Sequence, residues 1–321
     1  MATEQTVRSD EKVLEVDDLY KTYRIGFFRK RVDAVRGISF QVGRGEIFGF
    51  IGPNGAGKTT TIKAILQLIY PTQGVARLFG RPTGYPEARR RLGYMPESPY
   101  IYQYLKPLEF LDLCGKLSGM KGARLRKRSR EVLERLGLGH AVDRPIGKFS
   151  KGMLQRIGLG QALLHEPELL ILDEPFTGLD PIGRKDVREV LVEHRNQGGT
   201  MLFTSHTLSD VEMLCDRVAI IRAGRLGAYG ELSELLAPAE RRIEIELEGV
   251  KPELREQIDR IAATVQGEKE LLTAVVLGDE VIPQLLEKAL ANGARVLAVR
   301  PHRDTLEDLF IRHAEGGEAN N

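Results

Sequence analysis

The feature that most constrains this chain is a glycine-rich octapeptide and the threonine that follows it: Gly52, Pro53, Asn54, Gly55, Ala56, Gly57, Lys58, Thr59 and Thr60. It fits the phosphate-binding loop pattern, in which two glycines flank four residues and are followed by Lys and then by Ser or Thr. A short apolar run at residues 46–51 precedes it, and apolar residues recur at helical spacing over residues 61–66. The pattern therefore stands in the strand, loop and helix context that it requires.

Each residue type in this loop has its own physical reason. Glycine lets the backbone turn tightly and approach a ligand, because it has no side chain and tolerates positive φ. Successive N–H groups and the N-terminus of the following helix can then converge on an anion. We expect Lys58 to reach the β- and γ-phosphates of a nucleotide and Thr59 to bind Mg²⁺ through its hydroxyl. The alternative is a glycine-rich turn that only joins a strand to a helix.

The composition is that of a globular chain with room for two domains. Apolar residues make up 42% and charged residues 29% of the 321 residues, which is an ordinary globular balance. The net charge of +2 identifies no polyanionic partner. Cys114 and Cys215 lack metal-ligand spacing, which favours a reduced cytosolic compartment.

The sequence also bears on any role at a membrane. The polar N-terminus is unlike a secretory signal. No apolar run approaches the ~20 residues that a spanning helix needs. We therefore expect any membrane role to depend on another polypeptide.

The residues before the loop predict strands and one aromatic contact to the ligand. Residues 13–16 are expected to form a first edge strand, and residues 38–42 alternate like a half-buried strand. Residues 27–31 have the character of a basic aromatic loop. Tyr23 is our candidate for stacking on an adenine ring. Alternatively, Tyr23 packs against the sheet edge, since strand tyrosines are common.

The middle of the chain changes from strands to helices. Residues 75–79 and 92–95 have the pattern of strands, and residues from about 105 to 148 have helical character. This helical part contains a basic run: Lys121, Arg124, Arg126, Lys127, Arg128 and Arg130. Such a run can contact nucleic acid, anionic lipid or an acidic partner, or it can be the solvated face of a helix.

A second well-marked helix begins after residue 149. Ser150 is its expected N-cap, and apolar residues at helical spacing come after it. Together with Lys151 and Gly152, the uncovered helix N-terminus would make a good anion site. Ser and Gly open many helices, so the weight of this pattern depends on the motifs further along the chain.

An apolar strand at residues 169–173 ends in two adjacent carboxylates, Asp173 and Glu174. Consecutive residues of a strand point to opposite faces, so the two carboxylates can have different roles. One can hold Mg²⁺ near Thr59, and the other can orient the attacking water. The alternative is a pair of surface acids that end a strand. A turn at residues 178–181 then leads into a helix expected over residues 182–195.

The next strand, residues 200–204, is followed by Ser205 and His206. Ligands bind at the carboxyl ends of parallel strands in open α/β sheets. We therefore interpret His206 as part of the site, against the alternative of a packed or surface histidine.

The last part of the chain has a different composition. After a hairpin around Ala223 and Gly224, residues 241–321 contain 11 Lys and Arg against 16 Asp and Glu. The alternating patterns predict a small α/β accessory domain without chemistry of its own, with strands at residues 242–247, 274–277 and 295–299 and helices over residues 281–291 and from residue 305.

Taken together, these residues resemble the ATP-binding cassette (ABC) ATPases over residues 12–235, and several motifs occur in the right order. The resemblance implies a P-loop NTPase fold with a mixed sheet core, an antiparallel β edge and a helical subdomain at about residues 100–165. The small α/β domain then occupies residues 240–315. By resemblance, residues 52–60 are the Walker A loop and residues 169–173 are Walker B.

The resemblance also assigns the remaining site residues. Glu174 corresponds to the general base, His206 to the switch histidine and Tyr23 to the adenine-stacking aromatic residue. Ser150, Lys151 and Gly152 lie in the stretch similar to the family signature, which contacts the ATP of another subunit, and residues 178–180 resemble the D-loop. The family usually has glutamine where this chain has Glu97, and a carboxylate there would add negative charge near Mg²⁺. The signature departs from the usual Ser-Gly-Gly-Gln, because it reads Ser-Lys-Gly-Met.

The implied function is that of an ATP-hydrolysing exporter subunit with ATP and Mg²⁺ as ligands. Its partners would be a separate multi-span permease and a second ABC ATPase chain, which we expect to be another copy of this one. It would then be cytoplasmic, bound peripherally to the cell membrane, with residues from Glu97 to about Leu117 facing the permease. Direct binding to nucleic acid is not expected.

Two alternatives come from other classes of protein. A soluble ABC ATPase acting on nucleic acid or ribosomes commonly has two cassettes or a long coiled-coil insertion, and neither is evident here. A P-loop kinase would leave residues 150–156 and His206 unexplained.

Overall fold

The computed structural model describes residues 11–26, 30–237, 242–268, 271–278, 280–302 and 305–309. The chain divides into two compact units, with the division between Leu232 and Ser233. Of the basic aromatic loop expected at residues 27–31, residues 27–29 lie outside the described part. Within the described residues, no helix is both long and apolar enough to cross a bilayer. Cys114 and Cys215 are both free.

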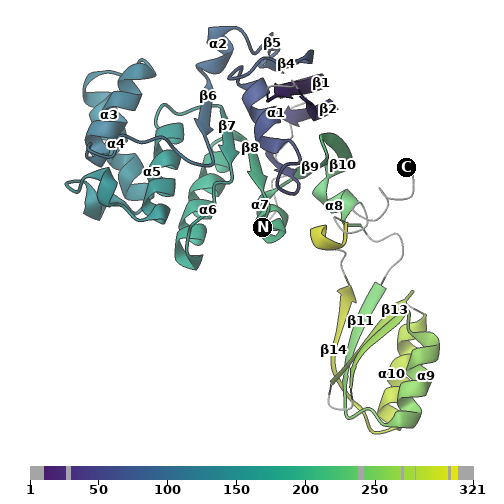
Figure 1. The fold of residues 1–321 in the computed structure, drawn as a ribbon. Coiled ribbons are helices and arrows are strands. Elements are labelled where there is room, and N and C mark those ends of the chain that lie inside the picture. The colour runs from purple at the N-terminus through teal and green to yellow at the C-terminus, as the bar shows by residue number, and fades with distance from the viewer. Residues whose placement is uncertain are drawn as a thin grey trace. The chain divides into compact units, whose positions relative to one another are not determined.

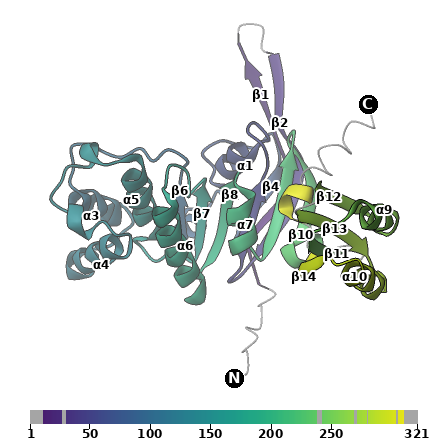
Figure 2. The same cartoon turned by 90° about the horizontal axis from the view of Figure 1, so that it is seen from below.

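The first unit contains an antiparallel sheet of four strands in the order β2-β1-β4-β5. Its two long strands, β1 and β2, run side by side and extend past the rest of the sheet (Figure 2). The bounds are Lys12–Ile25 for β1, Lys30–Gly43 for β2, Gln73–Leu78 for β4 and Arg81–Pro82 for β5.

The prediction of an edge strand at residues 13–16 is wrong in both the position and the length of the strand. These residues begin β1, which pairs with β2 on one side and β4 on the other. The register shifts between Val16 and Leu19, where Asp18 has a φ of 46°. This irregularity interrupts the alternation of apolar residues, so the pattern in the sequence ends long before the strand does.

The second sheet of this unit has six strands in the order β10-β9-β3-β8-β7-β6. The neighbours from β9 to β6 pair in parallel, and β10 pairs antiparallel to β9. This is the mixed sheet that the sequence predicts. The bounds are Ile47–Ile51 for β3, Leu92–Met95 for β6, Leu169–Asp173 for β7, Thr200–Ser205 for β8, Arg217–Arg222 for β9 and Arg225–Glu231 for β10.

Strands β3, β7 and β8 are buried along their whole length. A parallel strand covered on both faces is apolar throughout, which is why these runs do not alternate. Helix α1 (Lys58–Ile65) packs against β1, β2 and β4 of the first sheet and against β7 of the second (Figure 1). Helices α6 (Pro181–Asn196) and α7 (Leu208–Leu214) pack on strands of the second sheet. The short helices α2 and α8 span Pro86–Arg89 and Leu232–Leu235.

Three helices form a separate group beside the β6 edge of the sheet (Figure 1). They are α3 (Pro107–Leu117), α4 (Gly122–Arg135) and α5 (Lys151–Leu163), and two short 3₁₀ turns, Gly139–Ala141 and Ile146–Lys148, lie between α4 and α5. These elements account for the helical character that the sequence shows from residue 105 onward.

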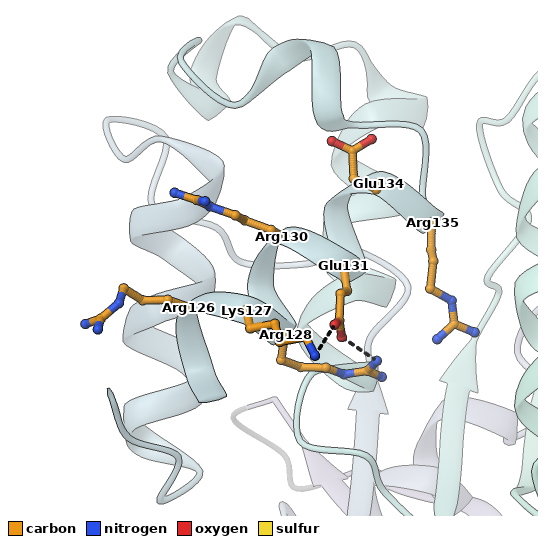
Figure 3. A pocket seen from close by; sticks show the side chains of 7 residues that line it. All are labelled: Arg126, Lys127, Arg128, Arg130, Glu131, Glu134 and Arg135. Atoms are coloured by element: carbon orange, nitrogen blue, oxygen red, sulfur yellow. Dashed lines mark ion pairs between the residues drawn. The ribbon is translucent and has the colours of Figure 1, made fainter. Parts of the chain in front are cut away.

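The basic run of the sequence lies mainly on α4, beside a surface cavity of about 820 Å³ (Figure 3). Lys127 and Arg128 both pair with Glu131, each at 3.7 Å. Arg126 and Arg130 point away from these pairs (Figure 3). Ion pairs within the same helix favour the interpretation of this face as solvated.

The second unit is an antiparallel sheet in the order β12-β13-β11-β14 with two helices, in the chain order strand, helix, strand, strand, helix, strand. Its core includes Ile245, Leu254 and Leu285. The strands are β11 (Arg242–Glu248), β12 (Thr264–Glu268), β13 (Leu271–Leu277) and β14 (Arg295–His302), and the helices are α9 (Pro252–Ile261) and α10 (Val281–Ala291).

Two elements of the second unit, α9 and β12, are absent from the sequence prediction. The first has only two buried apolar residues, Leu254 and Ile258. The second is mostly polar and contains Gly267 at a φ of 92°. The expected cap of the last helix is present, because Thr305 and Asp308 exchange side-chain to backbone hydrogen bonds.

Candidate functional site

A cavity of about 390 Å³ lies at the carboxyl ends of the parallel strands. It brings the glycine-rich loop together with Glu97, Asp173, Glu174 and His206, which are far apart in the sequence. The residues that line it are Ala34, Pro53, Asn54, Gly55, Ala56, Gly57, Lys58, Thr59, Thr60, Glu97, Asp173, Glu174, Thr177 and His206.

The glycine-rich loop joins β3 to α1, and two of its glycines are required by the local geometry. A Cβ at Gly52 would lie 2.2 Å from the carbonyl oxygen of Ile221. Gly57 is the N-cap of α1 with a φ of 110°, and a Cβ there would lie 2.5 Å from the carbonyl oxygen of Ala34. The loop can therefore lie against its neighbours and keep the N-terminus of α1 open to the cavity.

Lys58 is the first residue of α1, and its side chain is 7% exposed. Its ammonium group donates hydrogen bonds to the carbonyl oxygens of Gly52 at 2.7 Å and Pro53 at 3.3 Å. Gly52 does not itself line the cavity and contacts the site through this hydrogen bond to Lys58. The ammonium also lies 3.9 Å from Oε1 of Glu174. A buried cation held by its own loop is placed to meet phosphate oxygens in the cavity.

Glu174 follows the last residue of β7 and is 7% exposed. Its Oε2 lies 2.7 Å from Nδ1 of His206. The backbone φ of Glu174 is 53°, a left-handed conformation that a residue other than glycine adopts at a cost of ~1–3 kcal/mol. The surrounding contacts that hold this conformation therefore also fix the direction of the carboxylate.

Asp173 is the last residue of β7 and is 1% exposed. Its Oδ1 accepts a hydrogen bond of 2.6 Å from the hydroxyl of Thr204 on β8. Its Oδ2 is buried and has no hydrogen-bond partner among the described residues. An unpartnered carboxylate oxygen that shares its cavity with Thr59 fits a Mg²⁺ ion, which takes one or two protein carboxylates and completes its shell with phosphate and water.

The described residues contain no cluster of three or more His, Cys, Asp or Glu that could hold a metal ion by itself. Burial and the charge of Asp173 raise the pKa of the nearby Tyr94 phenol to about 12, with burial the larger cause. Tyr94 is therefore neutral at physiological pH.

Four further predicted residues do not line this cavity. Tyr23 lies on β1, with the ammonium of Lys21 5.1 Å from its ring centroid. Ser150 caps α5 by accepting a hydrogen bond of 3.3 Å from an N–H of the first turn, which also contains Lys151 and Gly152. Ser150, Lys151 and Gly152 do not line this cavity. The resemblance implies that they contact the nucleotide of another subunit.

Sequence reasoning missed four residues that surround the acidic pair or the loop. Thr177 lines the cavity, and its backbone N–H donates a hydrogen bond of 3.2 Å to the carbonyl oxygen of Glu174. Ala34 approaches Gly57 through its backbone, so no side-chain pattern could identify it. Thr204 occurs within a buried strand, where threonine is ordinary. Gln155 follows the signature by two residues and donates a hydrogen bond of 2.9 Å to the carbonyl oxygen of Glu174.

Comparison with known proteins identifies the family. A model of the ABC transporter family matches residues 35–177. An ABC transporter ATP-binding protein of Synechocystis sp. is 37% identical over 315 residues, which cover 97% of this chain and 87% of that protein. The chain belongs to the ABC transporter ATP-binding proteins.

Two further comparisons extend this result. The bacitracin transport ATP-binding protein of Bacillus licheniformis is 36% identical to this ABC protein, over 95% of this chain and 98% of the relative. A solved ATP-binding subunit of an ABC transporter is 35% identical with a TM-score of 0.63, over 70% of this chain and 91% of that structure. The predicted fold class is thereby confirmed.

The family assignment also decides between the functions left open by the sequence. This ABC protein is an ATPase, the ATP-binding and ATP-hydrolysing subunit of an exporter-type transporter that works with a separate permease. A P-loop kinase is excluded. The transporter relatives favour this function over a soluble ATPase acting on nucleic acid or ribosomes.

Proposed function

We propose that two copies of this chain bind two molecules of Mg·ATP between them, with Glu174 as the general base of hydrolysis. The observation that carries this proposal is the position of the Glu174 carboxylate. It is buried, lies 2.7 Å from His206 and 3.9 Å from Lys58, and lines the same cavity as the glycine-rich loop. A carboxylate in this place can orient a water molecule and accept its proton, which is typically worth ~10²–10⁴-fold in rate.

The other cavity residues would bind the phosphates and the metal ion. The N–H groups of the loop and the N-terminus of α1 bind the phosphates, and Lys58 compensates the charge of the β- and γ-phosphates. Thr59 and Oδ2 of Asp173 would hold Mg²⁺, with Glu97 in the lining of the same cavity. When bound, Mg²⁺ would neutralise the charge that develops on the phosphate oxygens.

Residues outside the cavity complete the site from a second subunit. Ser150, Lys151 and Gly152 present a helix N-terminus and an ammonium group, which suit the γ-phosphate of ATP held by the partner. Tyr23 of the same subunit as the loop would stack on the adenine. ATP then joins the two subunits, and hydrolysis releases them.

The transporter would place this chain at the cytoplasmic face of the cell membrane, bound peripherally through its permease. Residues 97–117, which include the start of the helical group, would meet that permease. The name of the bacitracin transport relative makes bacitracin, or a compound like it, one candidate cargo.

Replacing Glu174 with Gln tests the proposed base. Glu174→Gln keeps the shape of the side chain but cannot accept the proton, so we expect ATP binding to persist, turnover to stop and a dimer to accumulate with Mg·ATP. Steady-state ATP hydrolysis and size-exclusion chromatography measure the two effects. Glu189→Gln, on the exposed face of α6, is the matched control and should behave as wild type. Turnover of Glu174→Gln at the wild-type rate would refute the role of this residue.

A further inference from the structure

The strained backbone of Glu174 is held at both of its polar groups by side chains from other elements. The N–H of Glu174 donates a hydrogen bond of 2.9 Å to the hydroxyl oxygen of Thr204 on β8. The carbonyl oxygen of Glu174 accepts the hydrogen bond of 2.9 Å from Nε2 of Gln155 on α5 and a second one of 3.2 Å from the backbone N–H of Thr177. Both side chains are buried, with exposed fractions of 0% for Thr204 and 4% for Gln155.

The hydroxyl of Thr204 has a second contact, because it donates its proton to Oδ1 of Asp173 at 2.6 Å. One hydroxyl therefore joins the two adjacent carboxylate residues. The hydroxyl oxygen of Thr204 accepts the hydrogen bond from the N–H of Glu174, and the single hydroxyl proton goes to Asp173. The orientation of the hydroxyl is therefore fixed. Oδ2 of Asp173 is then the oxygen that remains without a partner in the described part of the chain.

Strand pairing explains why Thr204 is in the right place. Strands β7 and β8 are parallel neighbours, and Asp173 is opposite Thr204 in their register. The chain leaves β7 directly after Asp173, so the N–H of Glu174 no longer takes part in the ladder between strands. The hydroxyl of Thr204 takes the place of the missing ladder acceptor.

We infer that Thr204 and Gln155 are positioning residues for hydrolysis, which act by holding Glu174 in its left-handed conformation and so aiming its carboxylate at the attacking water. This inference rests on the proposed role of Glu174 as the base. Neither residue lines the nucleotide cavity, so each would act through Glu174. Gln155 also joins the backbone of Glu174 to α5, the helix whose N-terminus would contact the partner's ATP.

The experiment compares Thr204→Val with Thr200→Val in the full-length protein. Both threonines are fully buried on β8, and each accepts a hydrogen bond from a backbone N–H, which for Thr200 comes from Gly45. Loss of the Thr204 hydroxyl should lower kcat by about 10- to 100-fold, since displacing a group near the chemistry by ~1 Å can cost 10²-fold. The Mg²⁺-free affinity for ATP should be unchanged, because Thr204 does not line the cavity and Asp173 would bind the metal ion rather than the nucleotide. Thr200→Val should keep the wild-type kcat.

A conservative substitution and a second site make the result decisive. Thr204→Ser retains the hydroxyl and should restore most of kcat. Gln155→Met removes the side-chain donor to the carbonyl oxygen of Glu174 and leaves the backbone N–H of Thr177 as its remaining donor, so kcat should also fall. Gln161→Met on the same helix should keep the wild-type kcat. If Thr204→Val is insoluble, Thr204→Ala, which also lacks the hydroxyl, takes its place.

The outcomes separate this inference from the proposed function. Wild-type kcat in both Thr204→Val and Gln155→Met, with folding verified by thermal denaturation, would overturn the inference. Equal losses in Thr204→Val and Thr200→Val would also overturn it, because they would indicate a structural role alone. Full turnover by Glu174→Gln would instead remove the proposed base, whatever the other variants do.

Discussion

The conformation of one residue, Glu174, determines where its carboxylate points. A φ of 53° is rare for glutamate, and the neighbouring strand and helix supply the hydrogen bonds that stabilise it. His206 then contacts the carboxylate itself at 2.7 Å. The sequence predicted both Glu174 and His206 as site residues, but in separate roles, as the general base and the switch histidine. Their direct contact is a result of the fold.

Also at the scale of the residue, Lys58→Ala is expected to weaken ATP binding. Charge-assisted hydrogen bonds contribute ~1.5–3 kcal/mol each, so the loss of one corresponds to a Kd about 10- to 150-fold higher. Equilibrium titration with ATP measures the change. Lys63→Ala removes an exposed lysine from the same helix and serves as the control. Equal affinities for the two variants would contradict the assigned contact.

At the scale of the element, helix α6 carries a buried histidine near its C-terminal end. His194 is 9% exposed, and its Nε2 has no hydrogen-bond partner among the described residues. Burial lowers the pKa of His194 to about 4, and the charges of Arg135 and Arg128 add to this effect. The folded protein therefore excludes a proton that the unfolded chain accepts at its ordinary pKa of 6.5.

This difference predicts a loss of stability in mild acid. The contribution of His194 to stability is complete above pH 6.5 and falls between pH 6.5 and about pH 4, because only the unfolded chain is protonated there. In this range the free energy of unfolding decreases by up to about 1.4 kcal/mol for each unit by which the pH falls. Urea denaturation at about pH 7 and pH 5.5 measures the free energy of unfolding at each pH. His194→Gln should reduce the pH dependence, and the exposed His140→Gln should leave it as in wild type. The same slope in both variants would refute the assignment.

At the scale of the whole molecule, each compact unit has a hydrophobic core of its own. One core includes Phe48, Ile62 and Ile171, and the other includes Ile245 and Leu285. A unit with a separate core can fold by itself. The sequence predicted a domain change between residues 235 and 240, and the division between the two compact units lies after Leu232.

The prediction at this scale concerns an isolated fragment of residues 233–321. We expect it to unfold in one cooperative thermal transition, measured by circular dichroism. Ile245→Ala in this fragment should lower its stability by about 2–5 kcal/mol, the usual cost of truncating a buried isoleucine. Leu290→Ala, at an exposed position of α10, is the control and should cost much less. A fragment without a cooperative transition would contradict independent folding.

The sequence by itself determined the glycine-rich loop, the apolar strand that ends in Asp173 and Glu174, and the helix capped by Ser150. Each of these is a contiguous pattern whose geometry depends on local sterics and on hydrogen bonds between near neighbours. Only the tertiary structure decided that β1 is an interior strand, that Thr204 and Gln155 hold Glu174, and that His206 contacts it. These features depend on strand order and register, which arise from packing between segments far apart in the chain.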